Sequence, residues 1–175
     1  MDLIQAALST DEIPLERLLI KRGDILIRAG EKEKHISFVE KGALRAFALI
    51  GEEEFTIRFA YTGSIAASIP AYFSDQPSEV NIQAIRQSSL LCAHKKDFEA
   101  YMAKTTERLK THNTLLKELM GTFYEREVDL MISTPAERLE RVRQGSPQLF
   151  QEVPHKYIAS YLCMTPETLS RMLKS

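Results

Sequence analysis

The chain is poor in cysteine and contains no long apolar run. Its only cysteines, Cys92 and Cys163, lie far apart and have no CxxC partner. An iron–sulfur cluster needs four thiolates, so none is expected. No apolar stretch reaches the roughly 20 residues that a membrane span requires, and the acidic N-terminal stretch does not resemble a signal peptide. We therefore expect a cytoplasmic protein with free thiols and no membrane partner.

Residue patterns for catalysis or metal binding are also missing. The P-loop spacing and the G-x-S-x-G nucleophile elbow do not occur. The histidines show no H-x-H or H-x-x-x-H spacing, which argues against a metal site, and a haem held by one of them is the less favoured alternative. We expect no catalytic residue, no metal and no enzyme, and the sequence identifies no cofactor. The histidines are His35, His94, His112 and His155.

The sequence between residues 20 and 92 contains a regular series of short apolar stretches. They recur about every ten residues, and glycine-containing turn signals separate them, as at 21–24 and 40–42. Short strands at even spacing indicate a sandwich or a jelly-roll barrel. The predicted strands lie within 25–27, 36–39, 44–50, 55–61, 80–85 and 90–92.

From Asp97 to about Ile132 the apolar period becomes helical. Apolar positions spaced alternately by four and three predict one long helix with a coiled-coil seam. We expect a parallel partner helix and hence a homodimer; packing on the helix's own barrel is the alternative. The predicted dimerisation residues are Leu109, His112, Leu116, Leu119 and Phe123. Gly121 is interpreted as a close packing point rather than a hinge.

The pattern of residues 134–175 predicts a bundle of three helices that packs against the long helix and is stabilised by it. The first helix begins at a capping box, Thr134 to Glu137. The stretch 154–175 then fits two short amphipathic helices separated by a tight turn, with Thr165 capping the second and Pro166 at its first position. This pattern is typical of a helix-turn-helix, whose second helix enters the DNA major groove.

Charge supports nucleic-acid binding only weakly. Residues 1–95 carry 11 basic and 13 acidic side chains, residues 96–133 carry 6 and 7, and residues 134–175 carry 6 and 4. The net charges are therefore −2, −1 and +2. Because phosphate contacts dominate affinity for DNA, we expect modest affinity from one subunit.

A β-roll, a long helix and a C-terminal helix-turn-helix resemble the CRP/FNR superfamily of bacterial transcription regulators over essentially the whole chain. The stretches 21–26 and 38–45 look like the family's opening strands, and Ile158-Ala159 and 165–171 look like its two DNA-binding helices. The resemblance implies an α+β fold with a jelly-roll-like sensor domain (1–95), a long dimerisation helix (96–133) and a helix-turn-helix domain (134–175). It also implies binding of double-stranded DNA as a homodimer.

The chain departs from the cyclic AMP-binding members of this family. Their phosphate-binding cassette reads roughly F-G-E-L-A and then R-S/T-A. Here Ser64 stands in place of the Glu, Ser78 stands in place of the Arg, and Glu79 follows. A carboxylate would repel a phosphate, so we predict that ordinary cyclic AMP does not bind. The pocket holds another small-molecule effector or none; its candidate residues are Gly63, Ser64, Ile65, Ala66, Ser78 and Glu79.

The DNA-reading end is predicted from residue chemistry. Arg171 is the first candidate for a base or phosphate contact, because Arg binds guanine bidentately, and Glu167 is the second. Thr168 and Ser170 are further contacts, and Lys156 and Tyr157 can touch phosphates from the first helix. Cys163 occupies the turn position that usually carries Gly, at a cost of roughly 1 kcal/mol if φ is positive.

The recognition helix predicted here is short, and the sequence as given shows no β-hairpin wing. The alternative function is therefore an effector- or protein-binding module with a degenerate pocket, in which the helix-turn-helix serves packing and reads little DNA sequence. We expect Arg171→Ala to separate the two functions, because it removes specific DNA binding only from a regulator.

Overall fold

The computed structural model describes residues 12–174 and has an α+β fold, as expected from the sequence. Eight strands form two four-stranded antiparallel sheets, ordered β1-β8-β3-β6 and β2-β7-β4-β5. The strands are β1 (Leu15–Ile20), β2 (Ile25–Ile27), β3 (His35–Lys41), β4 (Ala43–Ile50), β5 (Glu53–Tyr61), β6 (Ile65–Ala66), β7 (Asn81–Ala84) and β8 (Ser88–His94). Side chains from both sheets form the core of this β-roll, among them Val39, Leu44 and Leu90.

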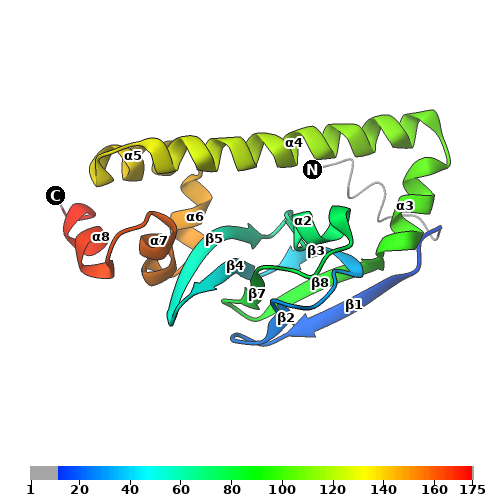
Figure 1. Cartoon of the computed structure of the whole chain (residues 1–175), viewed down its shortest axis with the longest axis horizontal. Coiled ribbons are helices and arrows are strands. Elements are labelled where there is room, and N and C mark those ends of the chain that lie inside the picture. Colours follow the sequence, from blue (N-terminus) through cyan, green and yellow to red (C-terminus); the bar gives the residue numbers. More distant parts are fainter. Residues whose placement is uncertain (1–11, 175) are drawn as a thin grey trace.

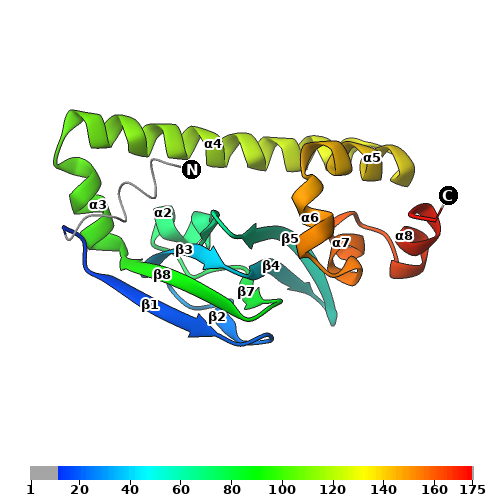
Figure 2. The same ribbon diagram turned by 180° about the vertical axis from the view of Figure 1, so that it is seen from behind.

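The helices lie beside and beyond the β-roll (Figure 1). They are α2 (Ile69–Ser74), α3 (Lys95–Ala103), α4 (Thr106–Met131), α5 (Pro135–Gly145), α6 (Pro147–Glu152), α7 (His155–Tyr161) and α8 (Pro166–Met172). Helix α4 spans the long dimension of the molecule, with α3 at one end and α5 to α8 at the other (Figures 1 and 2). No helix among residues 12–174 is long and apolar enough to cross a membrane.

A sharp turn between β3 and β4 depends on Gly42. Its φ is +108°, and a Cβ there would lie 2.7 Å from the carbonyl oxygen of Gln87. The turn brings the backbone of Ala43 beside Ser88, whose hydroxyl accepts a hydrogen bond from the Ala43 N–H at 3.2 Å. Only glycine fits both the backbone conformation and the close approach.

The prediction of one continuous helix from Asp97 to Ile132 is wrong. Thr105 has φ −139° and ψ 153°, so the helix stops there, and its side chain accepts a hydrogen bond from the Arg108 N–H as the cap of α4. The break lets α3 turn onto the β-roll, where Phe98 and Met102 are buried. Both residues belong to the predicted seam, yet they pack in the core of their own chain.

Two further expectations about the helical part are corrected. The C-terminal region has four helices within its described residues, because α6 forms where the sequence indicated only apolar contacts. This region also packs on the β-roll rather than mainly on α4, since Ala43 and Ile85 share one buried cluster with Ile158 and Leu162. Gly121 is exposed and a Cβ there would meet nothing within 4 Å, so it is not a close packing point.

Candidate functional site

Helices α7 and α8 form a helix-turn-helix with a closed apolar interior. Ile158, Ala159, Leu162 and Leu169 are completely buried between the helices and their neighbours. The Thr165 side chain accepts a hydrogen bond from the Thr168 N–H at 3.2 Å, and Pro166 occupies the first turn of α8. Both sequence-predicted start signals of α8 are therefore confirmed.

The turn of this motif passes through the left-handed region of backbone space. Cys163 has φ 53°, so this position, which usually carries glycine, does have a positive φ. A residue with a Cβ is strained there by roughly 1 kcal/mol. The Cys163 side chain is exposed, so it gains no burial in exchange.

Helix α8 presents a polar face to solvent. Glu167, Ser170 and Arg171 are exposed on it and share a shallow surface hollow with Pro166 and Lys174. Lys174 was missed from the sequence, although its i, i+3 spacing from Arg171 places it on the same helix face. The structure thus brings together three of the predicted DNA contacts and adds a second cation.

Thr168 and the two candidates on α7 have contacts inside the chain. The Thr168 hydroxyl lies 3.1 Å from that of Thr165. Lys156 is exposed, and its ammonium lies 4.6 Å from the ring centre of Tyr157. Tyr157 is half-buried, because its other neighbour is the Arg45 guanidinium at 4.3 Å.

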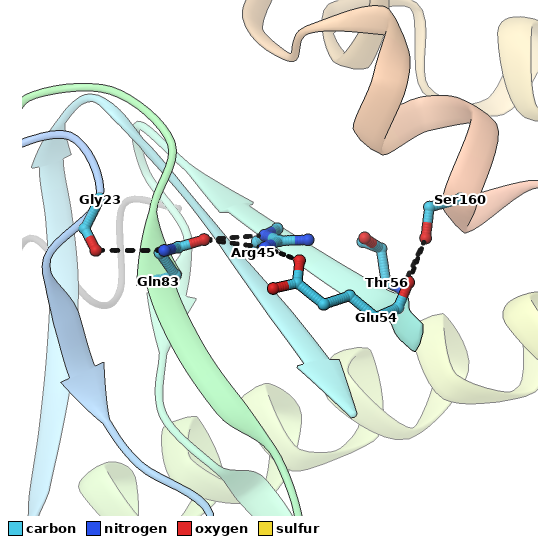
Figure 3. Close-up of polar contacts among 6 residues, drawn as sticks. All are labelled: Gly23, Arg45, Glu54, Thr56, Gln83 and Ser160. Atoms are coloured by element: carbon cyan, nitrogen blue, oxygen red, sulfur yellow. Dashed lines mark hydrogen bonds and ion pairs between the residues drawn. The ribbon is translucent and has the colours of Figure 1, made fainter. Parts of the chain in front are cut away.

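Arg45 connects the β-roll to α7 through Tyr157, and Figure 3 shows its polar contacts with Gln83 and Glu54. Its side chain is 4% exposed and lies between the rings of Phe47, at 4.1 Å, and Tyr157. It donates hydrogen bonds to Gln83 Oε1 at 2.9 and 3.1 Å and forms an ion pair with Glu54. Gln83 in turn donates to the carbonyl of Gly23 at 3.1 Å. Side chains from the two neighbouring strands and the rings of Phe47 and Tyr157 therefore fix the position of the guanidinium.

Ser160 makes a second link between α7 and strand β5 (Figure 3). Its hydroxyl accepts a hydrogen bond from the Thr56 N–H at 2.9 Å and donates one to the Glu54 carbonyl at 3.2 Å. Two backbone groups of an edge strand thereby find partners on the helix. The first helix of the helix-turn-helix is thus docked on the β-roll in this arrangement.

A cavity of about 720 Å³ lies where β5, α4 and the C-terminal helices meet. Of the predicted effector residues, Gly63, Ser64 and Ile65 line it. Ala66 is buried in the β-roll core instead. The remaining walls of the cavity combine apolar side chains such as Leu115 and Leu149 with several charged groups.

The two cassette positions are placed elsewhere. Ser78 is buried, and its hydroxyl is within hydrogen-bond distance of the Ser68 hydroxyl at 2.8 Å and of the Val80 carbonyl at 2.7 Å. Glu79 is exposed. The hydroxyl partner of Ser78 is therefore Ser68, a residue that the sequence analysis did not single out. The structure therefore does not bring Ser78 and Glu79 to the cavity.

Two arginines on the cavity wall lack full hydrogen bonding. The Arg58 guanidinium lies 4.0 Å from the ring centre of Phe123, and that of Arg126 lies 3.9 Å from the ring centre of Tyr161. Burial lowers the pKa of Arg58, and the nearby positive charge of Arg126 lowers it further. Burial also raises the pKa of Tyr161, which stays neutral.

The predicted dimerisation residues fall on two sides of α4. Leu109 is exposed, and Leu116 and Phe123 are partly exposed. His112 instead packs edge-on against Phe98, with 6.1 Å between ring centres, and burial lowers its pKa. Leu119 lines the cavity. Exposed apolar residues that the sequence pattern missed are Met120, Tyr124, Leu130 and Met131.

Comparison with known proteins gives one family and a set of similar folds. The Cyclic nucleotide-binding domain family matches residues 17–105. FixK2 from Bradyrhizobium japonicum is similar with a TM-score of 0.78 and 16% identity, over 93% of this chain and 84% of that one. A CooA mutant from Carboxydothermus hydrogenoformans has a TM-score of 0.75 and 18% identity, over 98% of this chain and 82% of that one.

A CRP-family transcriptional regulator from Thermus thermophilus is also similar, with a TM-score of 0.68 and 16% identity, over 90% of this chain and 82% of that one. No curated protein matches the chain in sequence. At these identities the solved structures show the fold, which is that of CRP/FNR-family transcription regulators.

Proposed function

The chain belongs to the cyclic nucleotide-binding domain family, and on this premise we propose that it is a cytoplasmic transcription regulator that binds double-stranded DNA as a homodimer. The observation that carries the proposal is the exposed polar face of α8, on a capped helix-turn-helix at the end of a CRP/FNR-like fold. Its three units are a sensor (1–95), a dimerisation segment (96–133) and a DNA-binding domain (134–175). The regulator is not an enzyme.

Arg171 is the principal DNA contact in this proposal. Its side chain is exposed on α8 and has no hydrogen-bond partner among the described residues, so its guanidinium is free to bind guanine bidentately. Glu167 and Ser170 on the same face supply further base contacts, and Lys174 supplies a phosphate contact. Lys156 reaches a phosphate from α7, whereas Thr168 mainly supports the cap.

Dimerisation uses the exposed apolar stripe of α4. On a helix of 3.6 residues per turn, positions 109, 116, 120, 124 and 131 fall within about 80° of arc. Met120 is 67% exposed and Met131 is 79% exposed, and a stripe of this length is normally covered by a partner. A parallel pair of α4 helices would carry two copies of α8, as reading of a palindrome requires.

Ordinary cyclic AMP is not the effector in this proposal. The Ser78 hydroxyl is already engaged with Ser68 and Val80, and no arginine stands beside it in the cassette. The exposed carboxylate of Glu79 adds a charge of the wrong sign for a phosphate. An effector of another class binds in the cavity between the β-roll, α4 and the C-terminal helices.

Such a ligand would act by changing how the helix-turn-helix is held. The cavity wall includes Arg58 of β5, Leu115 of α4, Val142 of α5 and Tyr161 of α7, so one ligand touches the sensor, the dimer helix and the DNA-binding domain. Helix α7 also carries the two residues that dock it on the β-roll, Tyr157 against Arg45 and Ser160 against Thr56. Differential binding to two positions of α7 shifts the spacing of the two α8 helices.

The test is fluorescence anisotropy of the purified chain with DNA from its own upstream region, over a salt series. We expect saturable, sequence-selective binding that Arg171→Ala weakens by about tenfold or more. Arg143→Ala is the matched control, since Arg143 is an exposed cation on α5 outside the α8 face. Weak binding that is equal for all sequences and unchanged by Arg171→Ala would favour the alternative, an effector- or protein-binding module.

A further inference from the structure

We infer that Arg58 and Arg126 form a binding site for the head group of a small organic anion in the cavity between β5, α4 and α7. This inference deepens the proposed function, because it assigns a chemical class to the effector. The site adjoins Ser64 of the cassette stretch but not the other two cassette positions, since neither Ser78 nor Glu79 lines the cavity. It places the anion-binding groups on β5 and α4 instead.

The first observation is an unsatisfied buried cation. Arg126 is 9% exposed, and its Nη1 atom is buried with no hydrogen-bond partner among residues 12–174. An arginine with a buried, unpaired N–H loses hydration without compensation, which costs on the order of a few-fold to a hundredfold in an equilibrium. Proteins rarely keep such a group without a partner. A bound anion supplies one.

The second observation is a like charge beside the first. Arg58 also lines the cavity, and its Nη1 atom is likewise buried and unpaired among the described residues. Its Nη2 atom donates to the Thr122 hydroxyl, which fixes the guanidinium on the α4 side. Two positive groups that face one space repel each other, and an anion between them removes that repulsion.

An aromatic ring lies against each guanidinium group, and the Nη1 atom of each has no hydrogen-bond partner among the described residues. Arg58 stacks on Phe123 and Arg126 stacks on Tyr161, at 4.0 and 3.9 Å. Stacking uses the face of the guanidinium, whereas its N–H groups point outward in the plane. This arrangement presents forked donors that match the oxygens of a carboxylate or phosphate.

The carboxylates around the cavity do not neutralise the pair. Asp129 is bound by Arg141 at 2.7 Å. Glu118 and Glu125 also line the cavity, but both side chains are exposed, so water screens their charges. Neither Arg58 nor Arg126 forms an ion pair within residues 12–174, so an anion in the cavity would meet their positive charges directly.

The other walls indicate the body of the ligand. Leu115, Leu119, Val142 and Leu149 supply apolar surface, and Phe59 and Tyr61 supply aromatic surface. A volume of about 720 Å³ suits a drug-sized molecule. The expected ligand has an apolar or aromatic body and one phosphate, sulfonate or carboxylate head group.

The test uses 1-anilinonaphthalene-8-sulfonate as the probe and the full chain without DNA. We expect a saturable rise in probe fluorescence with one site per chain, which phenyl phosphate or benzoate displaces and neutral phenol does not. Comparison of the two acids identifies the preferred head group. Arg126→Gln and Arg58→Gln should each weaken probe binding by roughly tenfold, and Arg143→Gln should leave it unchanged.

Two results would overturn the inference. One is probe affinity that neither arginine substitution alters in a folded variant, with folding checked by circular dichroism. The other is equal displacement by phenol and by the two acids, which needs no variant and therefore holds even if Arg126→Gln does not fold. Because no DNA is present, anion binding without sequence-specific DNA binding would support this site while contradicting the proposed function.

Discussion

Two glycines, Gly42 and Gly121, differ in how strongly the structure requires glycine at their positions. Gly42 sits at φ +108°, with the Gln87 carbonyl 2.7 Å from where a Cβ would be. Gly121 lies inside α4 with open space around its Cα. The first glycine is required by the turn, whereas the second only weakens a helix, because glycine costs about 1 kcal/mol relative to alanine there.

Gly121→Ala should therefore raise the free energy of unfolding by about 1 kcal/mol. Gly42→Ala is the matched contrast and should lower it by about 2 kcal/mol or more, since it combines a positive φ with overpacking. Urea denaturation of the two variants and the parent checks both values. A loss of stability in Gly121→Ala would show that this position is covered in the assembled protein and not open.

At the scale of elements, the docking of α7 on β5 is the contact that organises the C-terminal half. Thr56 and Ser160 are 104 residues apart in sequence, yet the Thr56 N–H donates to the Ser160 hydroxyl at 2.9 Å. The Arg45 guanidinium adds a stacked contact with Tyr157 at 4.3 Å. These links hold the helix-turn-helix against the β-roll.

Ser160→Ala removes one partner from two backbone groups of β5. We expect a loss of about 1–2 kcal/mol in the free energy of unfolding and faster hydrogen exchange at the Thr56 amide. Ser170→Ala is the control, because Ser170 is exposed on α8 and away from β5. Unchanged protection of the Thr56 amide in Ser160→Ala would mean that α7 is not docked in solution.

Most elements could be predicted from local sequence signals, but their partners could not. Glycine-punctuated apolar stretches indicated six of the strands, and Thr165 with Pro166 marked the start of α8. The helix break at Thr105 was missed because Phe98 and Met102 continue the four-three spacing while they pack in the β-roll core. Spacing shows that a face is buried and does not show what buries it.

For the same reason, local sequence patterns predicted only part of the candidate site. Exposure of Arg171 and Glu167 followed from helix periodicity. The cavity and its arginines did not, because Arg58, Arg126 and Tyr161 come from three elements that no local pattern connects. Ser68 escaped notice for a similar reason, since its contact with Ser78 depends on the fold of the loop around α2.

At the scale of the whole molecule, α4 has one buried face and one exposed apolar face. One face, with Leu115 and Arg126, is buried against the same chain. The other carries exposed apolar residues along most of its length. A second copy of the chain would cover this stripe and hold two helix-turn-helix units at a fixed spacing.

Met120→Glu should convert the dimer to a monomer at micromolar concentration, because it puts a charge at the centre of the stripe. Analytical ultracentrifugation measures the change. Glu118→Gln serves as the control, since Glu118 lies on α4 outside the stripe. A parent protein that is already monomeric would contradict the proposed dimer, and a Met120→Glu variant that stays dimeric would place its interface elsewhere.

The most direct test of the central claim is selection of bound DNA from a random pool, followed by sequencing. A dimer that inserts one α8 helix from each subunit predicts an enriched inverted repeat, with half-site centres about one helical turn apart, roughly 34–36 Å, or a multiple of that distance. The same selection with Arg171→Ala should lose the repeat. Enrichment of no motif, or of the same motif by parent and variant, would contradict sequence reading by α8.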